Sequence, residues 1–171
     1  MRVLQISNLL ALFTALFFLG ACASVKTTDS GDADSGSASI AGVDSVDGVY
    51  VGSDTVKELA TGVPDRVFFA YDSYSVTTRG LVTLQKQAKW MEGNSSSTVI
   101  VQGHCDERGT REYNLALGER RANSAKDYVV GYGIDPSRIS TISYGKERPV
   151  ATASSESAWM KNRRAVTVQV N

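Results

Sequence analysis

Blocks of apolar residues separated by polar ones predict the elements of one folded domain over residues 64–171. Short β-branched and aromatic blocks predict four strands, at residues 67–71, 98–102, 139–144 and 165–170. Apolar residues spaced three and four apart predict helices that begin at Thr77 or Thr78 and at Arg111, with a short helix at 156–161. The order βαβαββ predicts an α+β fold, with helices packed on one face of a mixed four-stranded sheet.

The second predicted strand, residues 98–102, has the unbroken apolar sequence TVIVQ. Such a run is typical of a strand whose two faces are both covered. Glycine commonly follows the last turn of a helix, so we expect the two long helices to end near Gly93 and Gly131.

The longer predicted helix, residues 111–130, carries polar residues on the side that should face the core. On a helical wheel its apolar stripe consists of Leu115, Leu117, Ala122, Ala125, Tyr128 and Val129. Asn114 and Arg121 fall in the middle of that stripe. A buried guanidinium is tolerated only when paired and hydrogen-bonded, and the nearest acidic candidates are Asp106 and Glu107. Two interpretations stay open: Arg121 staples the fold internally, or it binds an anion from outside.

The pattern of residues 1–21 predicts a lipoprotein signal peptide. Arg2 gives a positive start, and the apolar run over residues 9–19 is shorter than the roughly 20 residues that a membrane helix needs. The tetrad Leu-Gly-Ala-Cys, which ends at Cys22, resembles the bacterial lipobox, in which the cysteine is acylated. The resemblance implies a lipid anchor on Cys22, and Ala23 after it implies sorting to the outer membrane. The alternative is a secreted protein in which Cys22 is a free thiol.

Residues 22–63 are rich in Ser, Gly, Asp, Ala and Thr. Such a composition cannot bury enough apolar surface to offset chain entropy, so the segment after the anchor predicts a flexible tether. Within it, residues 48–59 (GVYVGSDTVKEL) are less polar. This stretch either orders locally or binds a partner, and the sequence leaves both interpretations open.

The charge balance and the cysteines exclude some kinds of partner. Lys and Arg together number 18, as do Asp and Glu, so the chain offers no basic field for nucleic acid. Cys22 and Cys105 are the only cysteines, and acylation of Cys22 would leave Cys105 as a small packed thiol without a disulfide. Strand alternation from His104 to Glu107 would send neighbouring side chains to opposite sides, so we expect no metal site and no cofactor.

Four stretches of the predicted domain resemble the OmpA-like peptidoglycan-binding domain family. They are GHCDERGTREYNLALGERRA (103–122), VFFAYDSYS (67–75), SYGKERP (143–149) and KNRRAV (161–166). The resemblance covers roughly residues 64–171, and it implies a βαβαββ mixed sheet. The implied ligand is the diaminopimelate-containing stem peptide of peptidoglycan, held without covalent chemistry. Carried over position by position, the resemblance implies ligand contacts at Asp72, Asp106, Arg108, Thr110, Asn114 and Arg121.

Together with the lipobox and the tether, the resemblance implies an outer-membrane lipoprotein whose domain faces the periplasm and ties the outer membrane to the cell wall. It further implies work with the Tol proteins, TolB especially, in envelope integrity and cell division. Two alternatives are a wall-binding lipoprotein of the same family outside the Tol system and a cell-wall hydrolase. The sequence shows no activated nucleophile or water, so we expect a binding protein and not an enzyme.

The chemistry of this ligand suits two of the implied contacts. The free end of diaminopimelate is zwitterionic, so a carboxylate can bind its ammonium while a guanidinium binds its carboxylate. Asp106 and Arg121 are therefore expected to border one pocket. Simpler alternatives are that Asp106 caps the helix or pairs with an arginine, and that Asn114 bonds to the backbone near the helix start. Arg163 and Arg164 are expected to be structural or solvent-facing.

Overall fold

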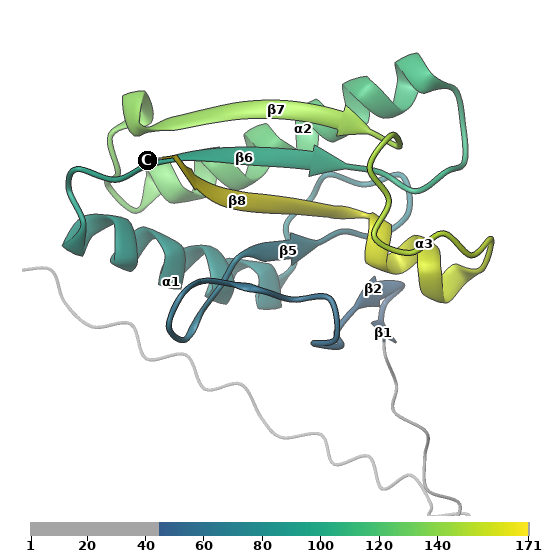
Figure 1. Ribbon diagram of the computed structural model, residues 1–171, viewed down its shortest axis with the longest axis horizontal. Helices are drawn as coiled ribbons and strands as arrows, with labels where there is room; N and C mark the ends of the chain where they lie inside the picture. Colours follow the sequence, from purple (N-terminus) through teal and green to yellow (C-terminus); the bar gives the residue numbers. More distant parts are fainter. Residues whose placement is uncertain (1–44, 171) are drawn as a thin grey trace, which may run out of the picture. The chain divides into compact units, whose positions relative to one another are not determined.

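The computed structural model describes residues 45–170, which lie within one compact unit, Ser39–Asn171. Its central sheet has four strands: β5 (Arg66–Phe68), β6 (Thr98–His104), β7 (Ile139–Gly145) and β8 (Arg164–Val170). The strands lie in the order β5-β8-β6-β7, with β6 and β7 parallel and the other two pairs antiparallel. Helices α1 (Thr78–Gly93) and α2 (Arg111–Gly131) cover one face of this sheet (Figure 1), which confirms the predicted α+β arrangement.

A hydroxyl side chain caps the start of each helix. Thr77 Oγ1 accepts a hydrogen bond from a first-turn amide of α1, and Thr110 Oγ1 does so for α2, both at 3.2 Å. Ser155 caps the short helix α3 (Glu156–Asn162) in the same way. A 3₁₀ turn, η1 (Pro136–Arg138), leads from α2 into β7. The caps fix where α2 and α3 begin, and both starts border the site described below.

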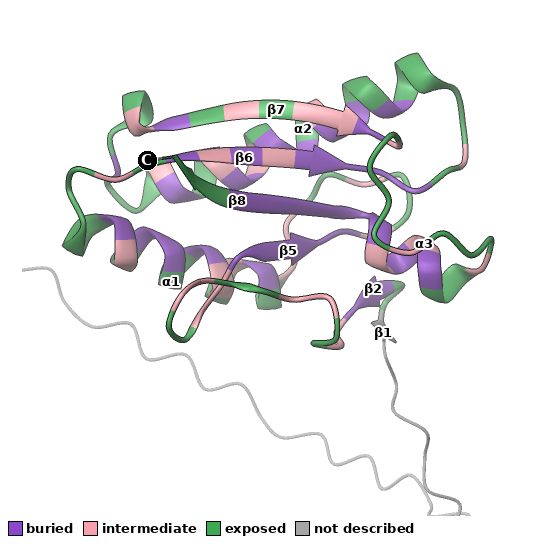
Figure 2. Ribbon diagram, viewed as in Figure 1, coloured by how far each residue is buried: buried purple, intermediate pink, exposed green. Residues whose placement is uncertain are grey.

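The hydrophobic core lies between the two long helices and the sheet face that they cover (Figure 2). Leu84 of α1 and Val99 and Val101 of β6 are buried there. On the opposite face Ile100 is only half-buried, and Val168 is 39% exposed. The expectation that both faces of residues 98–102 are covered was therefore wrong, because both long helices pack on the same side.

The end of the predicted tether carries two short hairpins. One pairs β1 (Ser45–Val46) with β2 (Val49–Tyr50), and the other pairs β3 (Glu58–Ala60) with β4 (Val63–Pro64). Tyr50 is 3% exposed, with its ring 4.9 Å from the Phe68 ring in an edge-on contact, and Val49 and Met160 complete this cluster. Residues 49–63 are thus folded against the domain rather than free, because their few apolar side chains find partners on β5 and α3.

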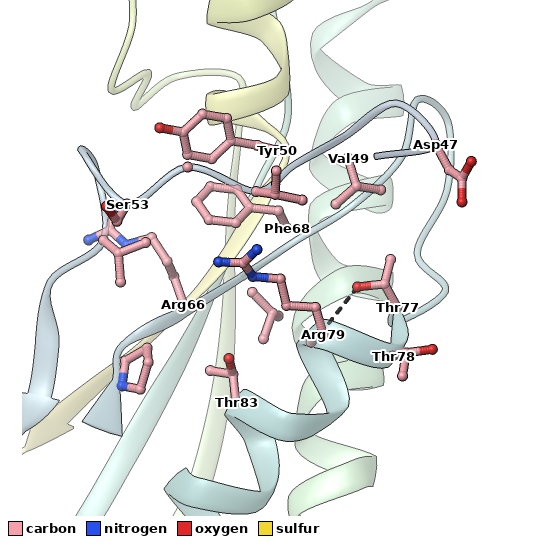
Figure 3. A pocket seen from close by; sticks show the side chains of 16 residues that line it. Asp47, Val49, Tyr50, Ser53, Arg66, Phe68, Thr77, Thr78, Arg79 and Thr83 are labelled. Carbon is pink, nitrogen blue, oxygen red and sulfur yellow. Dashed lines mark hydrogen bonds between the residues drawn. The ribbon is translucent and has the colours of Figure 1, made fainter. Parts of the chain in front are cut away.

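The predicted signal peptide, Cys22 and the tether up to residue 44 lie outside the described residues. Within residues 45–170, no helix is both long and apolar enough to cross a bilayer. A cavity of about 480 Å³ lies between the segment 47–56 and the start of α1 (Figure 3).

Candidate functional site

The end of β6 and the start of α2 meet in a corner, residues 105–114, that carries four of the six predicted contacts. Two glycines shape it. A Cβ on Gly103 would come within 1.8 Å of the Gly118 carbonyl oxygen, so the strand and helix backbones approach here more closely than another residue permits. Gly109 has a φ of +87°, in the left-handed region, and lets the chain turn into α2. We call this region the β6–α2 corner.

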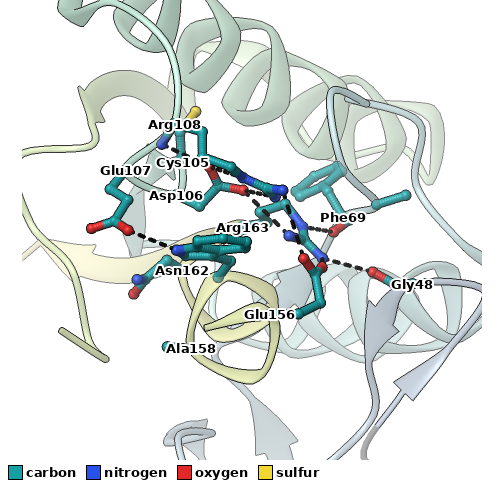
Figure 4. A network of polar contacts seen from close by, with 12 residues as sticks. Gly48, Phe69, Cys105, Asp106, Glu107, Arg108, Glu156, Ala158, Asn162 and Arg163 are labelled. Carbon is teal, nitrogen blue, oxygen red and sulfur yellow. Dashed lines mark hydrogen bonds and ion pairs between the residues drawn. The ribbon is translucent and has the colours of Figure 1, made fainter. Parts of the chain in front are cut away.

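Asp106 is the centre of an ion-pair network in the corner (Figure 4). Its Oδ2 accepts from Arg108 Nη2 at 2.7 Å and from Arg163 Nη1 at 3.3 Å, and its Oδ1 accepts from the Arg108 amide and Nε. Glu156 of α3 binds the same two arginines, at 2.8 Å from Arg163 and 3.6 Å from Arg108. Two carboxylates and two guanidinium groups therefore balance each other.

The electrostatics of Asp106 follow from this pairing. Burial acts to raise its pKa, but the hydrogen bonds and charge of Arg108, together with the bond from Arg163, outweigh burial and hold the pKa below its ordinary value. Asp106 is 4% exposed, so its negative charge is committed to the two arginines. Of the simpler alternatives for this residue, pairing with an arginine is the one that the geometry favours.

Arg108 is the more exposed of the two arginines in this network, with 31% of its side chain exposed against 1% for Arg163. Its guanidinium lies 4.1 Å from the ring centre of Tyr71 and 4.1 Å from that of Trp159. Trp159 Nε1 donates to Glu107 Oε1 at 3.0 Å, which fixes the indole. The two rings and Asp106 thus hold Arg108 in one orientation at the surface.

The loop after β5, residues 70–75, lies beside the corner. The hydroxyl of Tyr113, on the first turn of α2, donates to the carboxylate of Asp72. Asp72 is exposed and has a φ of 50°, a left-handed conformation that a short polar side chain tolerates. This loop therefore brings an accessible carboxylate to the same surface as Arg108.

Arg121 is fully buried, at 0% exposure, and its partners differ from those expected. Its Nε donates to the Ser73 carbonyl oxygen at 2.8 Å, its Nη2 to that of Ala70 at 3.1 Å, and its Nη1 to that of His104 at 2.9 Å. Nη1 also contacts Cys105 Sγ at 3.3 Å. Burial lowers the pKa of Arg121. This geometry favours the internal staple, because the guanidinium is taken up by backbone oxygens and makes no ion pair with Asp106.

Of the two remaining predicted ligand contacts, Asn114 is buried and Thr110 is exposed. Asn114 is 2% exposed, and its Nδ2 donates to the carbonyl oxygens of Arg108 at 2.7 Å and Thr110 at 3.0 Å, as the simpler alternative for this residue supposes. Thr110 is exposed and caps α2. The corner and the loop thus present Asp72, Arg108 and Thr110 to solvent, while Asp106, Asn114 and Arg121 hold them from behind.

Four residues of the network were not predicted from the sequence to be site residues: Tyr71, Glu156, Trp159 and Arg163. Arg163 was expected to be structural or solvent-facing; it is structural, at 1% exposure, and ties β8 to the corner. The stretch KNRRAV was the signal that could have pointed to it.

The sequence profile of the OmpA family matches residues 68–163, more than half of the chain. The chain belongs to the OmpA family. Curated relatives include the peptidoglycan-associated lipoprotein of Mesorhizobium japonicum, 43% identical, with the match covering 90% of this chain and 86% of the relative. That of Pseudomonas aeruginosa is 40% identical, with 96% and 97% covered.

A solved structure supports the same assignment. The crystal structure of the peptidoglycan-associated lipoprotein from Burkholderia pseudomallei is 39% identical and superposes with a TM-score of 0.61, covering 62% of this chain and 90% of that one. The mixed sheet with two helices on one face is therefore the OmpA-like fold, as the sequence resemblance implied.

Proposed function

We propose that this member of the OmpA family is an outer-membrane lipoprotein that binds peptidoglycan without covalent chemistry and ties the outer membrane to the wall. One observation carries the proposal: relatives named peptidoglycan-associated lipoprotein match 90% and 96% of this chain, far beyond the folded domain. Family membership and these names make the chain a binding protein and not an enzyme. Acylation of Cys22 by the predicted lipobox would supply the anchor.

The proposed ligand is the diaminopimelate of the stem peptide, and its two free charges suit the exposed surface of the corner. The planar guanidinium of Arg108 can bind the ligand carboxylate in a bidentate way, with the Thr110 hydroxyl as a further donor. The exposed carboxylate of Asp72 can bind the ligand ammonium. Both charges are needed, because leaving one partner of a desolvated pair unmatched typically costs 2–5 kcal/mol.

The buried predicted residues, on this proposal, hold the exposed ones in place and do not contact the ligand. Arg121 donates to the carbonyl oxygens of Ala70 and Ser73, which stand on either side of the Tyr71–Asp72 pair. It therefore fixes the loop that presents Asp72. Asp106 fixes Arg108, and Asn114 holds the backbone of the corner by two hydrogen bonds. A contact between Asp106 or Arg121 and the ligand itself would require Arg108 or the loop to move.

Binding to purified sacculi, with free diaminopimelate as competitor, tests the ligand. We expect residues 39–171 to pellet with sacculi, and Arg108→Gln and Asp72→Asn each to weaken this by about tenfold or more. Lys86→Gln, which removes an exposed charge from α1, is the matched control and should bind normally. Binding that diaminopimelate does not reduce would refute the site, and released muropeptides would favour the hydrolase.

The anchor and the partners need separate tests. Cys22→Ser should move the protein from the membrane fraction to the soluble fraction, and an unchanged distribution would contradict lipidation. We further propose that the domain faces the periplasm and works with the Tol proteins in envelope integrity and cell division. Copurification of TolB from envelopes is the expected result; its consistent absence, with sacculus binding intact, would favour a wall-binding lipoprotein outside the Tol system.

A further inference from the structure

The cavity beside α1 is formed by an arch, residues 47–56, that crosses β5 and the start of the helix. The arch is held at both ends. On one side the Gly48 carbonyl oxygen accepts from Arg163 at 2.9 Å and Tyr50 is buried against Phe68; on the other, the Lys57 amide donates to Asp65 at 3.0 Å. The space of about 480 Å³ beneath it is therefore part of the fold, and its size is that of a small-molecule site.

The walls of this cavity are mostly apolar. The arch contributes Val49 and Val56, and β5 contributes Val67 and Phe68. Such a lining accommodates an aliphatic chain, and each buried methylene contributes about 0.8 kcal/mol. Figure 3 shows Val49 and Phe68 among the side chains that line the cavity.

One cationic group in the cavity is free to bind a ligand. Arg66 also lines the space, but its guanidinium is bound bidentately by Asp65, at 2.8 and 2.7 Å. Arg79 makes no ion pair with any residue in 45–170, and Figure 3 shows its side chain reaching across the cavity toward Phe68. Asp47, the acidic residue of the lining, has its carboxylate at the edge and turned away from Arg79 in this view.

The surroundings of Arg79 also favour a negative charge. Thr77, Thr78 and Thr83 also line the cavity, and the first turn of α1 contains no acidic residue. The positive end of the helix dipole therefore adds to the charge of Arg79 and is not offset within the helix. An apolar space with one uncompensated cation at its wall is complementary to a molecule with an apolar body and one anionic group.

We propose that this cavity binds an amphipathic carboxylate of the fatty-acid type, with the aliphatic chain under the arch and the carboxylate on Arg79. None of the residues that line it belongs to the β6–α2 corner or to the loop 70–75, so the site is separate from the proposed peptidoglycan site. The arch coincides with the less polar stretch 48–59, whose sequence left open whether it orders locally or binds a partner. On this proposal it does both.

The test uses residues 39–171, the compact unit that contains the whole cavity, and decanoate below its critical micelle concentration as the probe. A thermal melt first verifies that each variant folds. We expect amide NMR shifts confined to residues 47–56, 66–68 and 77–83. Arg79→Gln should weaken decanoate binding about fivefold, the value of roughly one exposed charge pair. Lys89→Gln, an exposed lysine on the same helix, should leave binding unchanged.

Three further arms separate the parts of the proposal. Decanol should bind about as weakly to the native protein as decanoate does to Arg79→Gln, and acetate should not bind. Thr83→Trp should fill the cavity and abolish decanoate binding while sacculus binding stays normal. The proposal is overturned if decanoate shifts map elsewhere, if Arg79→Gln and Lys89→Gln bind alike, or if a folded Thr83→Trp still binds decanoate.

Discussion

Arg121 and Arg108 present the same guanidinium group in opposite surroundings. Arg121 is fully buried and donates to three backbone oxygens, without an acidic partner. Arg108 is partly exposed, paired with Asp106, and lies between two aromatic rings. A planar guanidinium can thus serve two uses. Buried among neutral carbonyl oxygens, it joins segments of backbone; partly exposed and paired with a carboxylate, it stays oriented toward solvent, where a ligand can reach it.

The interior arginine should carry the larger share of stability. Arg121→Met would leave the carbonyl oxygens of Ala70, Ser73 and His104 without their donor, and we expect the free energy of unfolding to fall by about 3–5 kcal/mol. Urea unfolding measures this. Arg120→Met, at the preceding position, which is exposed, is the control. A loss below about 1 kcal/mol for Arg121→Met would contradict the staple.

Stability should also depend on pH through His104, which is 3% exposed and stacks on Tyr144. Burial first, then the charges of Arg164, Arg66 and Arg148, lower the pKa of His104 to about 3. Because the folded-state pKa lies below the ordinary 6.5, the contribution of neutral His104 is present above pH 6.5 and is lost as pH falls toward 3.

Between pH 6.5 and 4.5 this loss should amount to about 2 kcal/mol, since one pKa unit corresponds to about 1.4 kcal/mol. His104→Phe should remove that slope from a series of urea melts, because Phe fills the same place without a titrating group. A variant with the native slope would show that His104 is not the group responsible.

The surface arginine should matter more for binding than for folding. Arg108→Gln should lower the free energy of unfolding by about 1 kcal/mol, because Asp106 keeps Arg163 as a partner and Arg108 is partly screened by solvent. A loss as large as that of Arg121→Met would remove the distinction between the two arginines. The pKa of Asp106 should rise, since Arg108 is the main group that lowers it, and a carboxyl NMR titration measures this.

The smallest effect is expected where both partners face water. Glu147 and Arg111 form a pair at 3.3 Å with side chains 53% and 68% exposed. Glu147→Gln should change stability by less than about 0.5 kcal/mol, and added salt should remove the difference. A larger, salt-insensitive loss in urea melts would mean that exposure does not separate the two kinds of arginine contact.

The sequence predicted the elements that have a strong period or a capping residue. The starts of α1 at Thr78 and of α2 at Arg111 were predicted, and so was the position of the buried Arg121 on the apolar stripe of α2. The hairpins at 45–64 could not be predicted, because strands of two or three residues depend on contacts with distant elements.

The site was predictable only where its members are close in the sequence. Asp106, Arg108 and Asn114 share one corner, so a single motif brings them together. Arg163, the partner of Asp106 that directly precedes β8, is 57 residues away, and the spacing of charges cannot reveal such a pair. The hydrogen-bond partners of the Arg121 guanidinium could not be predicted either, since the sequence does not show which backbone carbonyl oxygens lie close to it.

The folded arch has a mechanical consequence. If the chain is anchored at its N-terminal end, tension enters the domain at Gly48 and Tyr50, whose contacts with Arg163 and Phe68 are few and lie outside the main core. These contacts would break before the central sheet is loaded, and releasing residues 48–56 would free at most roughly 30 Å of extended chain. The arch would then lengthen under tension while the central sheet stays folded.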